Sequence, residues 1–235
     1  MKLLRKFVLS LTFSAAAMLA SPHLANADDC RSAPTPDIDW QNCDKKLLML
    51  GGSDLTKARL AGADFTATDL RNAVLHGAKL EKARLVRATL AGAVATGTSF
   101  ARVEAYRTDF SKMDAGQASF ESAELQRSNF TNANLVKANF TKADLGRSDF
   151  RGADVGGSTF SLTNLARADF RGARFSGPVD FERAFFFLTR IEDADLSTST
   201  GLSQWQLDMA CGNDKTELPE GLTKPASWPC GFEPD

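Results

Sequence analysis

The chain has 235 residues, with 28 basic and 29 acidic side chains and a formal net charge of −1. It contains four cysteines without a Cys-x-x-Cys motif, and only two histidines. Because zinc and redox centres are built from clusters of these residues, the composition disfavours a metal or redox role.

The first 27 residues have the pattern of a secretory signal. Basic residues precede an apolar stretch over residues 7–20, and Ala25-Asn26-Ala27 supplies a small-x-small cleavage pattern. The apolar run is shorter than the roughly 20 residues that span a membrane, so a retained anchor is the weaker interpretation. No later apolar run is long enough to cross a bilayer. We therefore expect a mature chain that begins at Asp28, without a transmembrane segment, in the periplasm or secreted.

A five-residue period runs from residue 55 to residue 175. Every fifth residue, which we call a centre, is apolar, and 22 of the 25 centres are Leu, Phe or Val. The residue two places before each centre is Ala in 15 units and Ser or Thr in 8, with Val103 and Met113 as larger exceptions. This period fits neither an α-helix nor a strand. It predicts a repeat architecture in which each unit buries its apolar face against its neighbours.

Units such as Ala63-Asp64-Phe65-Thr66-Ala67 and Ala143-Asp144-Leu145-Gly146-Arg147 resemble the A-(D/N)-(L/F)-x-x unit of pentapeptide-repeat proteins. The resemblance implies an all-β fold, a right-handed quadrilateral β-helix with one unit per face and 20 residues per coil. The register slips by one residue at Gly177-Pro178 and resumes to about residue 197. We therefore expect a pentapeptide-repeat solenoid of about seven coils over residues 53–197, with a bulged corner near Pro178.

Phenylalanine occupies every second centre from residue 100 to residue 170, and the centres between carry no aromatic side chain. Because ten residues make half a coil, these rings are expected to form ladders on two opposite faces, where stacked aromatic rings add stability. The members of this predicted core ladder are Phe100, Phe110, Phe120, Phe130, Phe140, Phe150, Phe160 and Phe170. The larger Val103 and Met113 precede alanine centres, which indicates that side-chain volume is conserved within a face.

The segments outside the repeat are predicted to cap the ends of the rod, which otherwise expose unpaired backbone. Residues 28–52 form the expected N-terminal cap. Residues 198–235 form the C-terminal cap, where Ser203 and Gln206 have the spacing of a helix capping box and a short helix stops at Gly212. The predicted lids over the apolar core are Trp40, Trp205 and Trp228.

The four cysteines lie in these end segments and predict two disulfides, because an even count is typical of disulfide bonding in an exported chain. Cys30 and Cys43 precede the first coil, whereas Cys211 and Cys230 follow the last. The length of the rod therefore separates the two pairs by more than the ~7 Å between Cα atoms that a disulfide tolerates. The expected bonds are Cys30–Cys43 and Cys211–Cys230.

Charge is distributed unevenly along the chain. Residues 53–175 hold 18 basic and 13 acidic side chains, a net charge of +5, whereas residues 176–235 hold 4 basic and 11 acidic, a net charge of −7. Within the rod, basic residues recur two places after a centre and acidic residues one place before it. The favoured interpretation is a solvated surface whose charges compensate each other. The alternative is a surface that binds an anionic partner.

No catalytic, cofactor-binding or metal-binding residues stand out from the repeat. The one histidine of the expected mature chain, His76, lies at an outward position, and no nucleophile, base and orienting group occur together. We therefore predict that the protein is not an enzyme and uses no cofactor.

The predicted function is that of a structural or protein-interaction scaffold in the cell envelope. Its partner is expected to be an unidentified protein rather than nucleic acid, and the chain itself a monomer or a weak homo-oligomer. Some cytoplasmic pentapeptide-repeat proteins resemble an acidic DNA duplex and bind DNA gyrase, so a topoisomerase-binding DNA mimic is one alternative, which the basic rod and the signal disfavour. An accessory of an envelope enzyme is the other.

Overall fold

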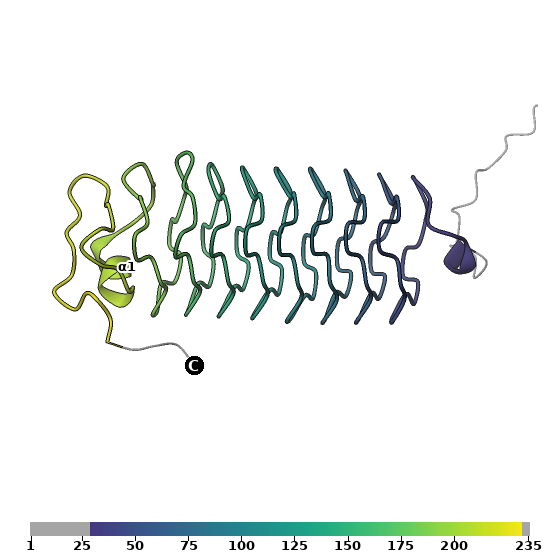
Figure 1. The fold of residues 1–235 in the computed structure, drawn as a ribbon, viewed down its shortest axis with the longest axis horizontal. Helices are drawn as coiled ribbons and strands as arrows, with labels where there is room; N and C mark the ends of the chain where they lie inside the picture. Colours follow the sequence, from purple (N-terminus) through teal and green to yellow (C-terminus); the bar gives the residue numbers. More distant parts are fainter. Residues whose placement is uncertain (1–28, 232–235) are drawn as a thin grey trace, which may run out of the picture.

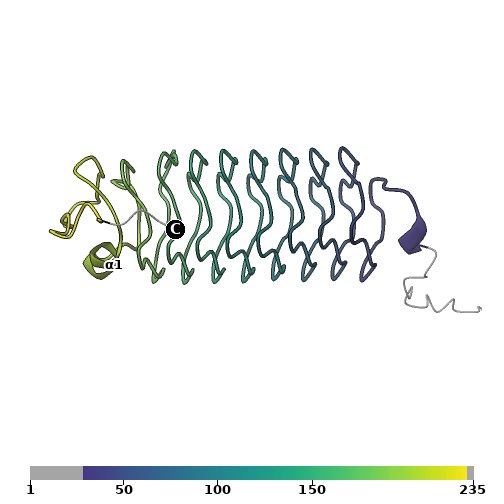
Figure 2. The ribbon, with the colours of Figure 1, turned by 60° about the horizontal axis from the view of Figure 1, so that its bottom comes forward.

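A computed structural model describes residues 29–231 as a rod of stacked coils (Figure 1). The predicted signal at residues 1–27 lies outside the described residues. The 3-10 helix η1 (Asp29–Arg31) and the α-helix α1 (Gln204–Met209) lie at opposite ends of the rod, as both views show (Figures 1 and 2). Between them, strand pairing consists of isolated parallel bridges, one in each five-residue unit.

Each five-residue unit is a tight turn followed by a bridging residue. In the unit around Leu80, the Ala83 amide donates to the Leu80 carbonyl oxygen at 2.9 Å, and Lys82 at the third turn position has a φ of 59°. A positive φ at this position is the mark of a type II turn. The amides of Leu80 and Lys82 donate to the Ser99 and Ala101 carbonyl oxygens of the next coil at 2.8 and 3.0 Å. Each unit therefore turns the chain and ties it to the neighbouring coil.

The units assemble into a right-handed quadrilateral β-helix, as the sequence predicts. Bridges such as Asp64 to Arg84 and Arg84 to Glu104 join residues 20 apart, so four turns complete one coil. All centres from residue 55 to residue 170 are at most 1% exposed. From residue 58 onward, the residues two places before them are at most 2% exposed, so each face contributes two side chains to a filled interior.

The eight phenylalanines from Phe100 to Phe170 lie in two ladders. Within a ladder, neighbouring ring centroids are 4.6–5.0 Å apart and the rings are nearly parallel. Between the ladders, centroids are 5.7–6.1 Å apart and the rings meet edge to face. Both arrangements are favourable for aromatic rings and add to the gain from burial.

Several inward small positions carry buried hydroxyl groups that the five-residue pattern treats only as small. Ser128 Oγ donates to the Ala105 carbonyl oxygen at 2.6 Å, and Ser148 Oγ donates to that of Leu125 at 2.7 Å. In both cases the acceptor is a centre 23 residues earlier. These bonds satisfy polar atoms that would otherwise be costly to bury.

The solenoid begins before residue 53, the boundary that the sequence predicts. The first bridge joins Asp39 to Arg59, and Trp40 and Lys45 occupy buried centre positions. Residues 36–52 are therefore part of the solenoid and not a separate cap. A search for apolar centres does not recognise this register, because Lys45 occupies one of the centres.

The solenoid also continues beyond residue 197, the predicted end. Its last bridges join Arg190 to Cys211 and Asp195 to Glu217. One column of bridges passes through nine residues, so the rod has more than the predicted seven coils. These residues are Asp39, Arg59, Lys79, Ser99, Ser119, Asn139, Thr159, Asp180 and Thr200.

The slip in the register is present where the sequence predicts it. The bridge from Asp154 to Arg174 spans 20 residues, whereas the next one, from Thr159 to Asp180, spans 21. The extra residue therefore lies between Arg174 and Asp180, in the segment that contains Pro178. This segment makes no bridge, and the regular register resumes after it.

Replacing Met113 with alanine is expected to lower the free energy of unfolding by about 2–5 kcal/mol, as for other buried methionines. Met113 is fully buried beside Ala115, an alanine centre that leaves room on its face. Denaturant titration of the oxidised protein measures the loss. An unchanged unfolding midpoint would show that Met113 does not replace the volume missing at Ala115.

Candidate functional site

The N-terminal end of the rod is closed by a tryptophan, a lysine and a disulfide. Trp40 is 1% exposed, and its Nε1 donates to Ser32 Oγ at 3.2 Å. Lys45 Nζ lies 3.4 Å from the centroid of the Trp40 ring and donates to the Cys30 carbonyl oxygen at 2.6 Å. Burial lowers the pKa of Lys45. The cation is held by the face of the indole ring and one carbonyl group.

The disulfide Cys30–Cys43 ties η1 to this end, with Cα atoms 5.4 Å apart. Cys43 occupies an inward position two places before Lys45, where most other units carry Ala, Ser or Thr. Trp40 therefore lies within the first coil, and the segment from η1 to residue 35 covers it. The sequence predicts the disulfide and the burial of Trp40, but not the role of Lys45.

At the C-terminal end, α1 takes the place of one five-residue unit. The Ser203 amide donates to Gln206 Oε1 at 2.8 Å, which starts the helix as the capping-box pattern predicts. Gln206 is 1% exposed, and its Nε2 donates to the carbonyl oxygens of Phe181 and Ala184 at 2.9 and 3.0 Å. One side chain thus provides partners for carbonyl groups of the preceding coil.

The prediction that Trp205 is a lid over the apolar core is wrong. Its side chain is 58% exposed, because α1 turns its neighbours Gln206 and Leu207 toward the interior. Trp228 does pack against the core, and its Nε1 donates to the Ala210 carbonyl oxygen at 2.8 Å. A side chain at Gly212 would lie 2.3 Å from the Trp228 ring, so glycine is needed there.

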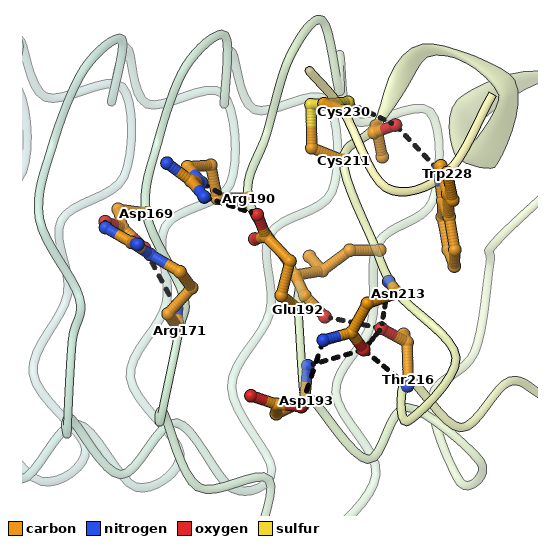
Figure 3. Close-up of polar contacts among 12 residues, drawn as sticks. Asp169, Arg171, Arg190, Glu192, Asp193, Cys211, Asn213, Thr216, Trp228 and Cys230 are labelled. Atoms are coloured by element: carbon orange, nitrogen blue, oxygen red, sulfur yellow. Dashed lines mark hydrogen bonds and ion pairs between the residues drawn. A yellow bond between two sulfur atoms is a disulfide. The ribbon is translucent and has the colours of Figure 1, made fainter. Parts of the chain in front are cut away.

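The second disulfide, Cys211–Cys230, lies beside Trp228 with Cα atoms 5.3 Å apart (Figure 3). Next to it, Asn213 Nδ2 donates to Asp193 Oδ1 at 3.0 Å, and Thr216 Oγ1 donates to the Ile191 carbonyl oxygen at 3.0 Å. These contacts bind the tail to the last regular coil. Both disulfides have the predicted pairing.

Replacing Cys211 and Cys230 together with serine is expected to lower the free energy of unfolding by about 3 kcal/mol, because the bond closes a loop of 19 residues and restricts the unfolded chain. Thermal unfolding of the variant and the oxidised parent measures the difference. The Cys30→Ser/Cys43→Ser variant is the matched control, with an expected loss of similar size. A midpoint equal to that of the parent would contradict the predicted role of the C-terminal bond.

The acidic row, one place before the centres, has a structural role in the turns. Asp64 Oδ1 accepts from the Thr66 amide, and Asp109 Oδ1 accepts from the Ser111 amide, both at 3.0 Å. The same contact recurs where asparagine replaces aspartate. The acidic row therefore reflects turn chemistry and is not by itself evidence for a binding site.

Three arginines one place after a centre pair with this acidic row on a single face. Their pairs are Asp69–Arg71 at 2.6 Å, Asp149–Arg151 at 2.6 Å and Asp169–Arg171 at 2.7 Å, the last drawn in Figure 3. Hydrogen bonds from the Arg71 side chain and backbone amide lower the pKa of Asp69 to about 2. On this face the opposite charges compensate each other, as the solvated-surface interpretation predicts.

A second set of arginines lies two places after a centre and forms one corner of the rod. It consists of Arg87, Arg107, Arg127, Arg147 and Arg167, which we call the arginine column. In the part of the chain that the structure describes, none of these guanidinium groups has a carboxylate within 4.0 Å. The place of a charge within a five-residue unit does not reveal this column, because its members lie 20 residues apart, one in each coil.

Two open, shallow hollows lie on the surface of the rod. One, of about 370 Å³, lies between α1 and the preceding coil, beside Arg183 and Trp205. The other, of about 330 Å³, adjoins the arginine column. His76 is exposed, and its Nδ1 makes a 2.6 Å hydrogen bond with Thr96 Oγ1. Within residues 29–231, no group of three His, Cys, Asp or Glu side chains is placed to hold a metal, and no helix could span a membrane.

A rod of stacked, four-sided coils with a filled interior defines a solenoid of the β-helix class. The chain belongs to the pentapeptide repeat family: the model of that family, described as pentapeptide repeats, matches with eight copies over residues 50–85, 83–121, 114–152 and 143–177. Pentapeptide repeat proteins are in general non-catalytic structural proteins. No curated protein matches the chain.

Solved structures of other pentapeptide repeat proteins are similar in fold. HetL, involved in heterocyst differentiation regulation in the cyanobacterium Nostoc sp. strain PCC 7120, is 22% identical, with 77% of this chain and 92% of HetL covered and a TM-score of 0.35. Full-length QnrB1, a plasmid-mediated fluoroquinolone resistance protein, is 13% identical, with 77% and 91% covered and a TM-score of 0.44. These likenesses concern the fold alone.

Proposed function

We propose that this protein is a non-catalytic scaffold of the cell envelope that binds another protein through the outer surface of its rod. The observation that carries the proposal is the filled interior. Every centre from residue 55 to residue 170 is buried, so the outer surface is what the rod presents to other molecules. The sequence supports the location, because the signal pattern of residues 1–27 precedes four cysteines that pair in two disulfides.

Cell fractionation of the full-length protein with a C-terminal tag tests the location. We expect a periplasmic or secreted product that begins at Asp28, which N-terminal sequencing identifies. A cytoplasmic product that retains residues 1–27 would contradict export. It would also favour the topoisomerase-binding alternative, although the net charge of +5 over residues 53–175 disfavours an acidic DNA mimic.

Affinity capture tests the scaffold role. The mature, oxidised chain serves as bait for envelope proteins, and a rod with the same interior but a scrambled outer surface is the control. We expect at least one protein that the parent retains and the scrambled rod does not. Identical sets of retained proteins would contradict a specific interaction surface. Hydrolytic activity that co-purifies with a captured protein would favour the enzyme-accessory alternative.

A further inference from the structure

The arginine column is a continuous feature of one corner of the rod. Its five members occupy the third turn position in five consecutive coils, each with a φ between 55° and 60°. On the adjoining face, bridges join Arg84, Glu104, Glu124, Asp144 and Asn164 in steps of 20 residues. Since neighbouring coils are ~4.8 Å apart, five guanidinium groups project along a line of roughly 19 Å.

The fold does not require arginine at this corner. A positive φ is most readily adopted by glycine and asparagine, and the other corners use varied residues at this position. The preceding corner, for example, carries Lys82, Arg102, Ser122, Lys142 and Leu162. Five like charges at the spacing of one coil repel each other. The charge of the column therefore does not stabilise the fold. Its guanidinium groups are instead directed outward, where another molecule can bind them.

The Asp144 carboxylate, which lines the hollow with Arg127 and Arg147, already has other partners. Asp144 accepts hydrogen bonds from Gln126 Nε2 at 2.8 Å, from Asn164 Nδ2 at 3.0 Å and from the Gly146 amide at 3.1 Å. These contacts hold the carboxylate on the face and away from the corner. Arg127 and Arg147, on either side of it, remain available to an external carboxylate.

The hollow of about 330 Å³ runs beside the column, with Arg127, Arg147 and Arg167 on one side. Gly146 and Ala166 also line it, and their small or missing side chains leave the hollow open. The hollow is therefore a shallow, open depression lined by three successive members of the column.

An exposed aromatic pair follows on the same face. The bridge from Asn164 to Phe185 places Phe185 in the next coil. Phe185 and Phe187 are 42% and 44% exposed, and their rings are stacked with centroids 6.2 Å apart. Arginine and aromatic residues are the side chains most enriched at the energetic centres of protein interfaces. This surface combines both within a few coils.

We propose that the arginine column and the Phe185–Phe187 pair bind an extended acidic polypeptide segment that carries an apolar side chain at one end. The inference rests on the proposed scaffold function and names its surface and partner class. Arginine binds carboxylates through two parallel hydrogen bonds, so an extended segment with acidic side chains can contact successive members of the column. The exposed Phe185–Phe187 pair favours a polypeptide, whose side chains can supply both carboxylates and an apolar contact.

The test is fluorescence anisotropy of a labelled synthetic peptide of alternating glutamate and threonine that ends in leucine and phenylalanine. The mature oxidised parent is compared with the variant Arg127→Glu/Arg147→Glu/Arg167→Glu. The matched control, Lys82→Glu/Arg102→Glu/Lys142→Glu, changes the same number of charges at the same turn position of another corner. Circular dichroism verifies the fold, and the milder Arg127→Gln/Arg147→Gln/Arg167→Gln variant replaces the first if it does not fold.

We expect the column variant to weaken peptide binding by about tenfold or more. The control variant is expected to weaken it much less, because charges outside the binding surface contribute little to affinity. Phe185→Ala/Phe187→Ala is expected to weaken binding only when the peptide has its apolar end. Equal losses in both charge variants, or no binding by the parent, would overturn the proposal. Tighter binding of single-stranded DNA or of phosphatidylglycerol vesicles would assign the column to another class of partner.

The capture experiment separates this proposal from the scaffold function. If the parent and the column variant retain the same envelope protein equally, the arginine column is not the interaction surface and the scaffold role stands. If the parent binds the acidic peptide but captures no envelope protein, the column binds as proposed and the scaffold role fails.

Discussion

Replacing Phe140 with alanine is expected to lower the free energy of unfolding by about 3–5 kcal/mol, in the range for buried aromatic residues. Phe140 is fully buried, and its ring stacks on Phe120 and Phe160 at 4.8 and 4.9 Å. It also meets the edges of Phe130 and Phe150 in the other ladder. Truncation removes four ring contacts and leaves a cavity that a rigid backbone of bridged coils closes poorly.

Phe140→Leu is the matched control, because leucine occupies the centres Leu135 and Leu145 on the adjacent faces of the same rod. We expect it to be clearly less destabilising than Phe140→Ala, since most of the buried volume is kept. Guanidinium denaturation of the three oxidised proteins measures both differences. Equal losses for the two substitutions would show that the ladder contacts contribute through ring geometry alone, and no loss for either would contradict a ladder in the interior.

Replacing Trp40 with alanine is the second large effect, with an expected loss of about 3–5 kcal/mol. Trp40 fills the first coil, and its ring supports the Lys45 ammonium group at 3.4 Å. The substitution leaves a buried cation with one remaining partner, the Cys30 carbonyl oxygen. Because a solenoid is stabilised by contacts between neighbouring repeats, the damage is expected to concentrate at this end.

Hydrogen exchange locates the effect of Trp40→Ala. We expect faster exchange of the Asn42 and Leu50 amides, which donate to the second coil, and unchanged exchange at Phe130. Trp40→Phe, which keeps an aromatic ring, is the control with a smaller effect. Uniform acceleration along the whole rod would contradict the nearest-neighbour description, and unchanged protection at Asn42 would contradict a structural role for Trp40.

Where the five-residue pattern is unbroken, sequence reasoning predicts the fold and its details. The phenylalanine ladders and the slip near Pro178 follow from position alone, because each residue's place in a unit determines whether it points inward. The pattern fails where its chemistry changes. Lys45 occupies a centre that is normally apolar, and it is tolerated because Trp40 and a carbonyl group receive its ammonium.

The last coil could not be predicted from the pattern because α1 replaces a unit of β-bridge structure. Gln206 lies inward there and hydrogen-bonds to the preceding coil, whereas Trp205, the expected lid, faces outward. A capping-box pattern predicts that a helix starts but not which of its sides is buried. That choice depends on the coil against which the helix packs.

The sequence predicts only part of the candidate site. The rows of basic and acidic residues are visible within each unit, whereas the arginine column requires comparison of residues 20 apart. Arg87 and its four successors are at that spacing in the sequence, so the signal is present once the coil length is known. Among the described residues, the column's own guanidinium groups have no carboxylate within 4.0 Å, and Phe185 and Phe187 are exposed. Both findings needed the structure, because both depend on neighbouring coils.

A continuous register of bridges aligns the outward side chains of successive coils, and the proposed binding surface depends on this alignment. The most direct test is the distance between spin labels introduced at Arg87 and Arg167 through an unnatural amino acid, which leaves the four cysteines paired. Four coil steps of ~4.8 Å predict one narrow distribution centred near 19 Å, after allowance for the label linkers. A broad distribution, or a mean far from this value, would contradict the aligned column.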